Sequence, residues 1–289
     1  MLLLVLAMIG RNRNKARGRI LMEQKEMQII GEGNTAEVYT WKEGQILKLF
    51  RKEFPFGGIE KEYKVSKEVE KLGLPIPKAG EIIEYNGRIG ILYERICGES
   101  LLMLITRKPW TTRQYVKKLA KLHYDMHQCQ ARNLGSYKEA LEWNINHSSV
   151  LTDHMKQEIL CLLKQLPAGD RLCHGDFHPG NIIKTKEDYI VLDWMTAASG
   201  CPGMDVARTA LLMKDAALPG NIPLFIRVII NVMRGRMLKD YLRYYKRHSG
   251  MTQEEIDCWR LPIIAARLAE WIPENERNTI MREIEGALI

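Results

Sequence analysis

The chain has 289 residues, of which 46% are hydrophobic and 27% are charged. These values are typical of a globular protein with one large or two modest domains, and they exclude a fibrous or disordered chain. The formal net charge is +8, but five of the 43 basic residues lie in residues 1–21, which contain no acid. From Met22 onward 38 basic residues stand against 35 acidic ones, so the charge predicts no nucleic-acid partner.

The spacing of the cysteines and the lengths of the apolar runs bear on where in the cell the protein is expected, and not on its function. No two of the six cysteines have the short spacing of a zinc site or of a small disulfide framework, which favours reduced thiols and a cytoplasmic location. The longest apolar run, Met1 to Ile9, is less than half of the ~20 residues that cross a bilayer. We therefore expect no stable membrane association.

Residues 1–21 consist of an apolar stretch followed by a basic one. A secretory signal has the opposite order, so secretion is not expected. We interpret these residues as a non-structural extension, translated from an upstream start codon, with the working protein beginning at Met22. The alternative is a weak amphiphilic membrane-surface segment.

The pattern from residue 27 to residue 94 predicts a small antiparallel sheet with one helix. Strands are expected at residues 27–31, 37–41, 45–50, 81–85 and 88–94, and the last two are joined by the hairpin signal Asn86-Gly87. Residues 58–72 have helical periodicity, with Glu62 inside the apolar arc. An unpaired carboxylate there would be costly, so we expect Glu62 to pair with Lys48, which lies between apolar residues on the third strand.

A run of eleven residues from Cys173 to Ile183, C-H-G-D-F-H-P-G-N-I-I, is followed at residues 190–194 by I-V-L-D-W. This arrangement presents Asp176, Asn181 and Asp193 near one another. Phosphoryl transfer from a magnesium nucleotide needs one group to accept the proton of the attacking hydroxyl and two to hold the metal. The alternative is a Gly/Pro turn between strands that carries acids by chance.

These residues resemble the H-G-D-x-H-x-x-N loop and D-W strand end of the aminoglycoside phosphotransferase and choline kinase family, small-molecule kinases with a protein-kinase-like fold. The resemblance implies an α+β, bilobal fold. A nucleotide-binding N-lobe of antiparallel strands with one helix is expected over residues 22–97, and a larger helical, catalytic and acceptor-binding C-lobe over residues 98–289. It also implies direct transfer of the γ-phosphate of ATP or GTP, with Mg²⁺, to a hydroxyl of a small molecule.

The same resemblance implies a role for each motif residue. Asp176 is expected to be the catalytic residue, and Asn181 and Asp193 are expected to bind Mg²⁺. The nucleotide is expected to contact the glycine turn, the third strand, its partner helix and the backbone of the hinge between the lobes: Gly31, Gly33, Lys48, Glu62, Glu94 and Ile96. The turn reads G-x-G-x-x-A-x-V, so Ala36 stands in the position of the kinase loop's third glycine.

Three other functions are less consistent with the sequence. A protein kinase carries Arg where this chain has Gly175, and only twelve positions separate Asp193 from Asp205, too few for a regulated activation segment. A catalytically inactive nucleotide-binding or scaffolding homologue would be expected to lack one of the motif residues, and none is missing. An acyl transferase or hydrolase would use His174 or Cys173, which we interpret as support for the loop. Asp205 resembles the family's buried acid beneath that loop, and Arg208 is its expected partner.

The C-terminal half is expected to be mainly helical, with a kink at Pro262 in a helix over residues 253–271. His123 and His127 have a spacing that could hold a metal, but no third ligand is evident, and core or interface histidines are the favoured interpretation. Four helical acids could bind a cationic amino sugar or amine, or simply face solvent: Asp257, Glu270, Glu274 and Glu276. Aminoglycoside, amino-alcohol and sugar-like acceptors therefore all remain open.

Overall fold

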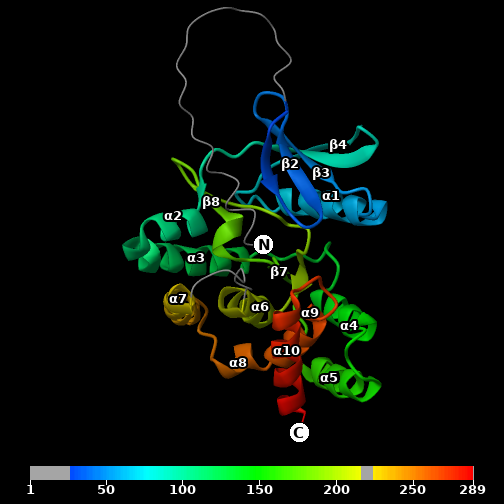
Figure 1. Cartoon of the computed structure of the whole chain (residues 1–289), viewed down its shortest axis with the longest axis vertical. Coiled ribbons are helices and arrows are strands. Elements are labelled where there is room, and N and C mark those ends of the chain that lie inside the picture. The colour runs from blue at the N-terminus through cyan, green and yellow to red at the C-terminus, as the bar shows by residue number, and fades with distance from the viewer. Residues whose placement is uncertain (1–26, 216–223, 289) are drawn as a thin grey trace, which may run out of the picture.

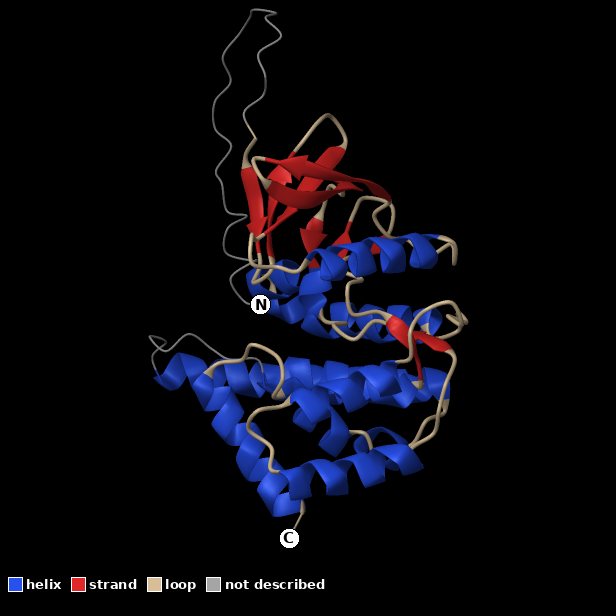
Figure 2. Cartoon of the chain, turned by 90° about the vertical axis from the view of Figure 1, so that its right-hand side faces the viewer, coloured by secondary structure: helices blue, strands red, loops and turns tan. Residues whose placement is uncertain are grey.

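The structure is a computed structural model that describes residues 27–215 and 224–288. The expectations for residues 1–21 lie outside these ranges. Figure 1 shows a lobe of strands above a larger lobe of helices, and Figure 2 shows the same division from the side. The expected bilobal α+β architecture is confirmed.

The upper lobe is built on a five-stranded antiparallel sheet with the strand order β1-β2-β3-β5-β4. All five strands lie within two residues of their predicted bounds: β1 (Ile29–Glu32), β2 (Ala36–Thr40), β3 (Gln45–Phe50), β4 (Ala79–Tyr85) and β5 (Arg88–Glu94). Asn86 and Gly87 both have positive φ, at 51° and 70°, as the two-residue hairpin turn requires. The turn residues thus fix the register of β4 against β5.

Helix α1 (Phe56–Glu70) packs against this sheet. Its Ile59 joins a buried cluster with Ala36, Phe50 and Ile91 from the strands. Glu62 lies on the same buried side and is only 2% exposed. The apolar arc of the sequence therefore does carry a carboxylate into the interior, where it needs a partner.

Short strands hold the loop of residues 174–181. One sheet has the order β6-β8-β9 and another pairs β10 with β7. Their members are β6 (Glu99–Ser100), β7 (Arg171–Cys173), β8 (Ile182–Lys184), β9 (Tyr189–Val191) and β10 (Ala198–Gly200). The loop runs from the end of β7, through the single turn η3 (Pro179–Asn181), to the start of β8. Both ends of the loop are thus fixed by backbone hydrogen bonds to other strands.

Helices form the rest of the lower lobe, and Figure 2 shows them in blue beneath the sheet. They are α2 (Leu101–Arg107), α3 (Thr112–Met126), α4 (Tyr137–His147), α5 (Asp153–Gln165), α6 (Pro202–Asp215), α7 (Leu224–Ser249), α8 (Glu254–Asp257), α9 (Arg260–Arg267) and α10 (Glu274–Ala287), with the turn η2 (Pro109–Thr111) ahead of α3. Ser100, Ser136 and Thr152 begin three of these helices by accepting a backbone N–H, which is a favoured N-cap interaction. Within the described ranges no helix is long and apolar enough to cross a membrane.

The predicted kink at Pro262 is wrong. The chain leaves its helical path earlier, at residues 258–259, and starts again as α9 at Arg260. Pro262 then lies in the first turn of α9, where a backbone N–H has no intrahelical partner to lose. The proline is therefore compatible with a straight helix that begins just before it.

Candidate active site

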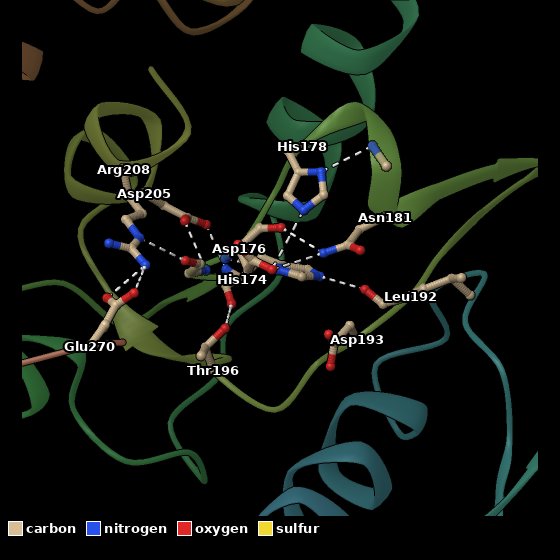
Figure 3. A network of polar contacts seen from close by, with 12 residues as sticks. His174, Asp176, His178, Asn181, Leu192, Asp193, Thr196, Asp205, Arg208 and Glu270 are labelled. Carbon is tan, nitrogen blue, oxygen red and sulfur yellow. Dashed lines mark hydrogen bonds and ion pairs between the residues drawn. The ribbon is translucent and has the colours of Figure 1, made fainter. Parts of the chain in front are cut away.

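The loop of residues 174–181 is fixed from below by Asp205 on α6. Its carboxylate accepts the backbone N–H of His174 at 2.5 Å and that of Gly175 at 2.9 Å, contacts drawn in Figure 3. On the other side of the chain, the Thr196 hydroxyl donates to the carbonyl of His174 at 2.8 Å. These bonds determine the path of the loop immediately before Asp176.

His123 and His127 are both buried, as the favoured interpretation predicted. Each points its Nε2 at Oδ2 of Asp205, at 3.1 and 3.3 Å. Each Nδ1 meets a tyrosine hydroxyl, that of Tyr241 at 2.6 Å and that of Tyr245 at 2.7 Å. Asp205 is the third group that the sequence did not reveal, and the three potential ligand atoms lie within 4.8 Å of one another.

This cluster is a hydrogen-bond network rather than a metal site. An ionised Asp205 can only accept, so each histidine must donate from Nε2 and accept the tyrosine proton at Nδ1. No imidazole lone pair then remains for a metal. Burial and the neighbouring His127 lower the pKa of His123 to about 3. Although burial raises the pKa of Asp205, hydrogen bonds from both histidines hold it well below its ordinary value.

Arg208 does not pair with Asp205, contrary to expectation. It binds Glu270 at 2.7 Å and donates to the carbonyl of Gly175 at 3.2 Å, because the oxygens of Asp205 already accept four N–H donors. Figure 3 shows Arg208 pointing away from Asp205 toward Glu270. Arg208 therefore supports the loop from a second side.

Two of the four acids considered for a cationic acceptor are engaged elsewhere. Arg267 binds Glu276 at 2.6 Å and Glu270 at 2.7 Å, and Glu270 also holds Arg208. Asp257 accepts a hydrogen bond from Gln253 on the surface. Glu270 and Glu276 thus neutralise the buried Arg208 and the partly buried Arg267, and a role for either acid in acceptor binding stays a prediction.

On the upper face of the loop, Asp176 and Asn181 are in direct contact. The Asn181 amide donates to Oδ2 of Asp176 at 3.1 Å and to its carbonyl at 3.0 Å. Oδ1 of Asp176 and Oδ1 of Asn181 accept no hydrogen bond from any described residue. Burial raises the pKa of Asp176, but His178 and then Arg208 lower it, and the net shift is downward. Asp176 is therefore a carboxylate with one unoccupied oxygen.

Asp193 stands two residues beyond β9 in the left-handed region, with φ of 60°. Aspartate tolerates this conformation better than most residues, but it still costs energy that the surrounding structure must offset. Hydrogen bonds of Leu192 provide that support: its N–H donates to the Asn181 carbonyl at 2.8 Å and its carbonyl accepts from His174 at 3.0 Å. Asp193 is thereby tied to the loop, with its side chain 40% exposed.

Lys48 on β3 joins the two lobes. Its ammonium lies 2.8 Å from Glu62, which confirms the predicted ion pair, and 3.1 Å from Oδ1 of Asp193 in the lower lobe. Burial lowers the pKa of Lys48, but the charges of Asp193 and Glu62 raise it more. Tyr93 on β5 supports Glu62, since its hydroxyl donates to that carboxylate at 3.0 Å. The lysine is thus charged and held in place beside Asp193.

The glycine turn is a hairpin between β1 and β2. The N–H of Gly33 donates to the Ala36 carbonyl at 2.8 Å, and Gly31 is paired with Val38. Arg51, which no sequence pattern singled out, donates to the carbonyls of Gly33 and Asn34 at 3.2 and 3.1 Å. Ala36 points its methyl group into the buried cluster of the sheet. The replacement of the third glycine therefore adds core packing.

The two hinge residues differ in how their backbone is used. The N–H of Glu94 donates to the Lys78 carbonyl at 2.9 Å. The backbone N–H and C=O of Ile96 form no hydrogen bond with any residue in the described ranges. Ile96 thus has both groups available for the edge of a purine base, whereas the N–H of Glu94 is occupied.

The structure brings Lys48, Glu62, Asp176, Asn181 and Asp193 into one connected set. The unoccupied oxygens of Asn181 and Asp193 are hard ligands of the kind that Mg²⁺ prefers, and the carboxylate of Asp176 can accept a proton. Among the supporting residues, Tyr93 was not singled out from the sequence, and Arg208 and Glu270 were named there for other roles. His178 carried a sequence signal only as a member of the loop motif.

The comparisons with known proteins agree with this geometry. The model of the phosphotransferase enzyme family matches residues 26–246. No curated protein sequence is significantly similar to the chain. Among solved structures, an amicoumacin kinase in complex with AMP-PNP, Ca²⁺ and Ami is 14% identical, with a TM-score of 0.59 over 91% of this chain and 88% of that one.

Two further solved structures share the fold. An aminoglycoside phosphotransferase from Streptomyces rimosus is 13% identical, with a TM-score of 0.58 over 85% of this chain and 93% of that one. A choline/ethanolamine kinase family protein from Mesorhizobium loti is 13% identical, with a TM-score of 0.56 over 91% and 88%. At this level of identity the structures establish the fold alone, and the family assignment rests on the sequence match. The chain belongs to the phosphotransferase enzyme family.

Proposed function

We propose that the chain transfers the γ-phosphoryl group of Mg·ATP or Mg·GTP directly to a hydroxyl of a small molecule. The observation that carries this proposal is the contact of Lys48 with Asp193 across the two lobes, next to the loop that pairs Asp176 with Asn181. A cation for phosphate, two oxygen ligands for a metal and a carboxylate base are the groups that this reaction requires.

In this proposal Asn181 and Asp193 hold Mg²⁺ through their unoccupied oxygens. The ion would neutralise charge on the nucleotide phosphates. Lys48, oriented by Glu62, would pair with those phosphates from the other side. The fit rests on the donor set, since oxygen ligands from one carboxylate and one carboxamide are what Mg²⁺ accepts beside phosphate oxygens.

Asp176 acts as the base. Its Oδ1 takes the proton of the acceptor hydroxyl as the acceptor oxygen bonds to the γ-phosphorus, and the bond from that phosphorus to the bridging oxygen breaks to release ADP or GDP. No phosphorylated enzyme is formed, because positioning and electrostatics supply most of the acceleration. The hydrogen bond from Asn181 engages Oδ2, which leaves Oδ1 to act as the base.

The nucleotide is proposed to lie between the glycine turn and the hinge. Gly31 and Gly33 would cover the phosphates, and the backbone near Glu94 and Ile96 would bind the base. The unpaired backbone groups of Ile96 support this placement, and those of Glu94 support it less. Because ATP and GTP are cytoplasmic metabolites, a cytoplasmic location is part of the proposal.

The acceptor class is proposed from the names of the related structures, which include streptomycin and gentamicin complexes of one phosphotransferase. We expect an aminoglycoside, amino-alcohol or sugar-like hydroxyl. The test is an acceptor screen with purified protein, measuring ADP or GDP release with streptomycin, gentamicin, choline and ethanolamine. Acceptor-dependent release would support the proposal. Failure to bind either Mg·ATP or Mg·GTP would overturn it in favour of a scaffolding homologue.

A further inference from the structure

His178 lies within the loop motif, directly beside the proposed base, and has no role in the reaction described so far. It caps the single turn η3: its Nδ1 accepts the backbone N–H of Gly180 at 3.0 Å. Its Nε2 is buried, forms no hydrogen bond with the described residues, and points at Oδ2 of Asp176 from 3.6 Å. Figure 3 shows the ring between these two partners.

The cap fixes the tautomer of this ring. A backbone N–H can only donate, so Nδ1 of His178 must carry a lone pair and the single proton of the neutral imidazole must be on Nε2. That proton points toward the carboxylate of Asp176. The ring therefore offers its one donor to the proposed base and to no other group in the described ranges.

The position of the ring is also fixed by the shape of the loop. A Cβ atom added to Gly180 would lie 2.7 Å from Cε1 and 2.9 Å from Nδ1 of His178. A side chain at position 180 would clash with the ring at these distances, so the glycine leaves the room that the imidazole occupies. The side chain is only 12% exposed. A ring confined in this way cannot easily turn its Nε2 toward solvent instead.

We infer that His178 is a positioning residue for the base. Its Nε2–H, together with the amide of Asn181, holds Oδ2 of Asp176 so that Oδ1 faces the acceptor hydroxyl. The separation of 3.6 Å is long for a hydrogen bond, but such contacts often shorten only when substrate is bound. The inference rests on the proposed function, since it gives Asp176 a partner in the role assigned there.

Two substitutions separate this role from the cap. His178→Asn places an oxygen near the position of Nδ1, so it preserves the hydrogen bond to Gly180 but removes the donor to Asp176. His178→Gln reaches the position of Nε2 and keeps a donor toward Asp176, at some cost to the cap. A purely structural role predicts that Asn is the milder change, whereas a positioning role predicts that Gln is.

The readout is steady-state turnover of Mg·ATP, with the best acceptor of the screen and, separately, with water as the acceptor. We expect His178→Asn to lower kcat about tenfold, the effect of one hydrogen bond to a charged group, with little change in the KM for Mg·ATP or in Tm. His178→Gln should recover part of this loss. The matched control His147→Asn, on the exposed end of α4, should leave kcat unchanged.

A double-mutant cycle completes the test. If His178 acts through the carboxylate of Asp176, then adding His178→Asn to Asp176→Asn should lower kcat no further. Normal turnover in His178→Asn, or an equal further loss in the Asp176→Asn background, would overturn the inference while leaving the proposed function intact. Normal turnover in Asp176→Asn alone would instead exclude Asp176 as the base, and this inference with it, whereas the proposed function is overturned by failure to bind Mg·ATP or Mg·GTP.

Discussion

The two faces of the loop of residues 174–181 differ in how their polar groups are used. Beneath the loop, the carboxylate of Asp205 is fully buried and accepts four N–H donors, from two backbone amides and two histidines. On the upper face, Asp176, Asn181 and Asp193 each keep one side-chain oxygen without a hydrogen bond to the described residues. Carboxylates on the two faces of one loop therefore differ in how fully their oxygens are hydrogen-bonded.

This difference shows what each face contributes. Buried polar groups that are fully hydrogen-bonded resist rearrangement, so the lower face fixes the backbone. Unoccupied oxygens beside a fixed backbone are positioned without reorganisation when charge develops near them, which is the main source of electrostatic catalysis. In the proposed function, the lower face therefore acts on stability and geometry, and the upper face acts on chemistry. The predictions for Asp176, for Asp205 and for acid test that division, and the last two predictions concern residues outside the loop.

The largest effect is expected for Asp176→Asn, which keeps size and polarity but removes the proposed base. Turnover should fall by about 10² to 10⁴, the usual effect of losing a general base. The Kd for Mg·ATP and the Tm should change little, because the carboxylate faces the acceptor. Steady-state kinetics and calorimetry check this, with the exposed Asp153→Asn as a control. Near-normal kcat would exclude Asp176 as the base.

Asp205→Asn, unlike Asp176→Asn, should greatly lower the free energy of unfolding. The new amide would place N–H donors against the N–H groups that Asp205 now accepts, and breaking such a buried network typically costs about 3 to 5 kcal/mol. Thermal unfolding measures the loss, and Asp257→Asn on the surface is the matched control. A Tm equal to that of the unmodified chain would show that the lower face does not fix the loop.

As the pH falls, the lower face should lose its contribution to the free energy of unfolding before the upper face is affected. The pKa of His123 falls from about 6.5 to about 3 on folding, so between these values the unfolded chain binds a proton that the folded chain does not. The stability from this group is present above pH 6.5 and is lost as the pH falls. The loss between pH 6.5 and 5 is on the order of 1.5 kcal/mol.

Burial also lowers the pKa of His174, which adds to the loss in the same direction. Asp205, whose pKa is held below its ordinary value, adds a further loss at lower pH. Denaturant unfolding at pH 7.5, 6.5 and 5.5 checks this prediction. A His123→Gln variant should show a smaller slope with pH, and an equal slope would contradict the assignment.

Tyr93→Phe should have a smaller and more specific effect. It removes the hydroxyl that bonds both Glu62 and Ser66, at 3.0 and 3.1 Å. Losing about 1 kcal/mol of hydrogen bonding around Glu62 should loosen the orientation of Lys48 and raise the KM for Mg·ATP about fivefold, with kcat less affected. Tyr85→Phe on strand β4 is the control. Equal KM values for both variants would show that Tyr93 does not orient the pair.

The smallest effect is expected on removing residues 1–21. Their sequence shows no helix or strand periodicity, so a chain that begins at Met22 should have the same Tm and the same affinity for Mg·ATP. Differential scanning fluorimetry and calorimetry of the two lengths make the comparison. A clear drop in either quantity would show that these residues belong to the folded protein.

The sequence was most informative where a local pattern carried the chemistry. The five longer strands followed from alternation and turn residues. The ion pair of Lys48 with Glu62 followed from a carboxylate inside an apolar arc. The order of the motif residues was enough to suggest the family. In each case the signal lay within a short window, or in a conflict between one residue and its neighbours.

The parts that were missed depend on contacts between distant segments. Strands of two or three residues, such as β6 and β10, are too short to show a period. Asp205 was anticipated only through the resemblance, and its meeting with His123 joins residues that are 82 positions apart. Arg208 was assigned to the wrong acid because its partner Glu270 lies 62 positions further along the chain, after α7 and α9. Spacing along the chain does not encode such pairs.

The contact between Lys48 and Asp193 has a consequence for nucleotide binding. An ammonium group has three N–H donors, and here Glu62 and Asp193 each engage one. In the proposed function a metal would bind the same carboxylate of Asp193, and phosphates would bind the same ammonium. Binding of the metal nucleotide would then replace the ion pair between Lys48 and Asp193 by two ion pairs, one from Asp193 to the metal and one from Lys48 to the phosphates. Measured affinity would therefore report the difference between these pairings, and Lys48→Met would remove the competitor of the metal as well as the ligand of the phosphates.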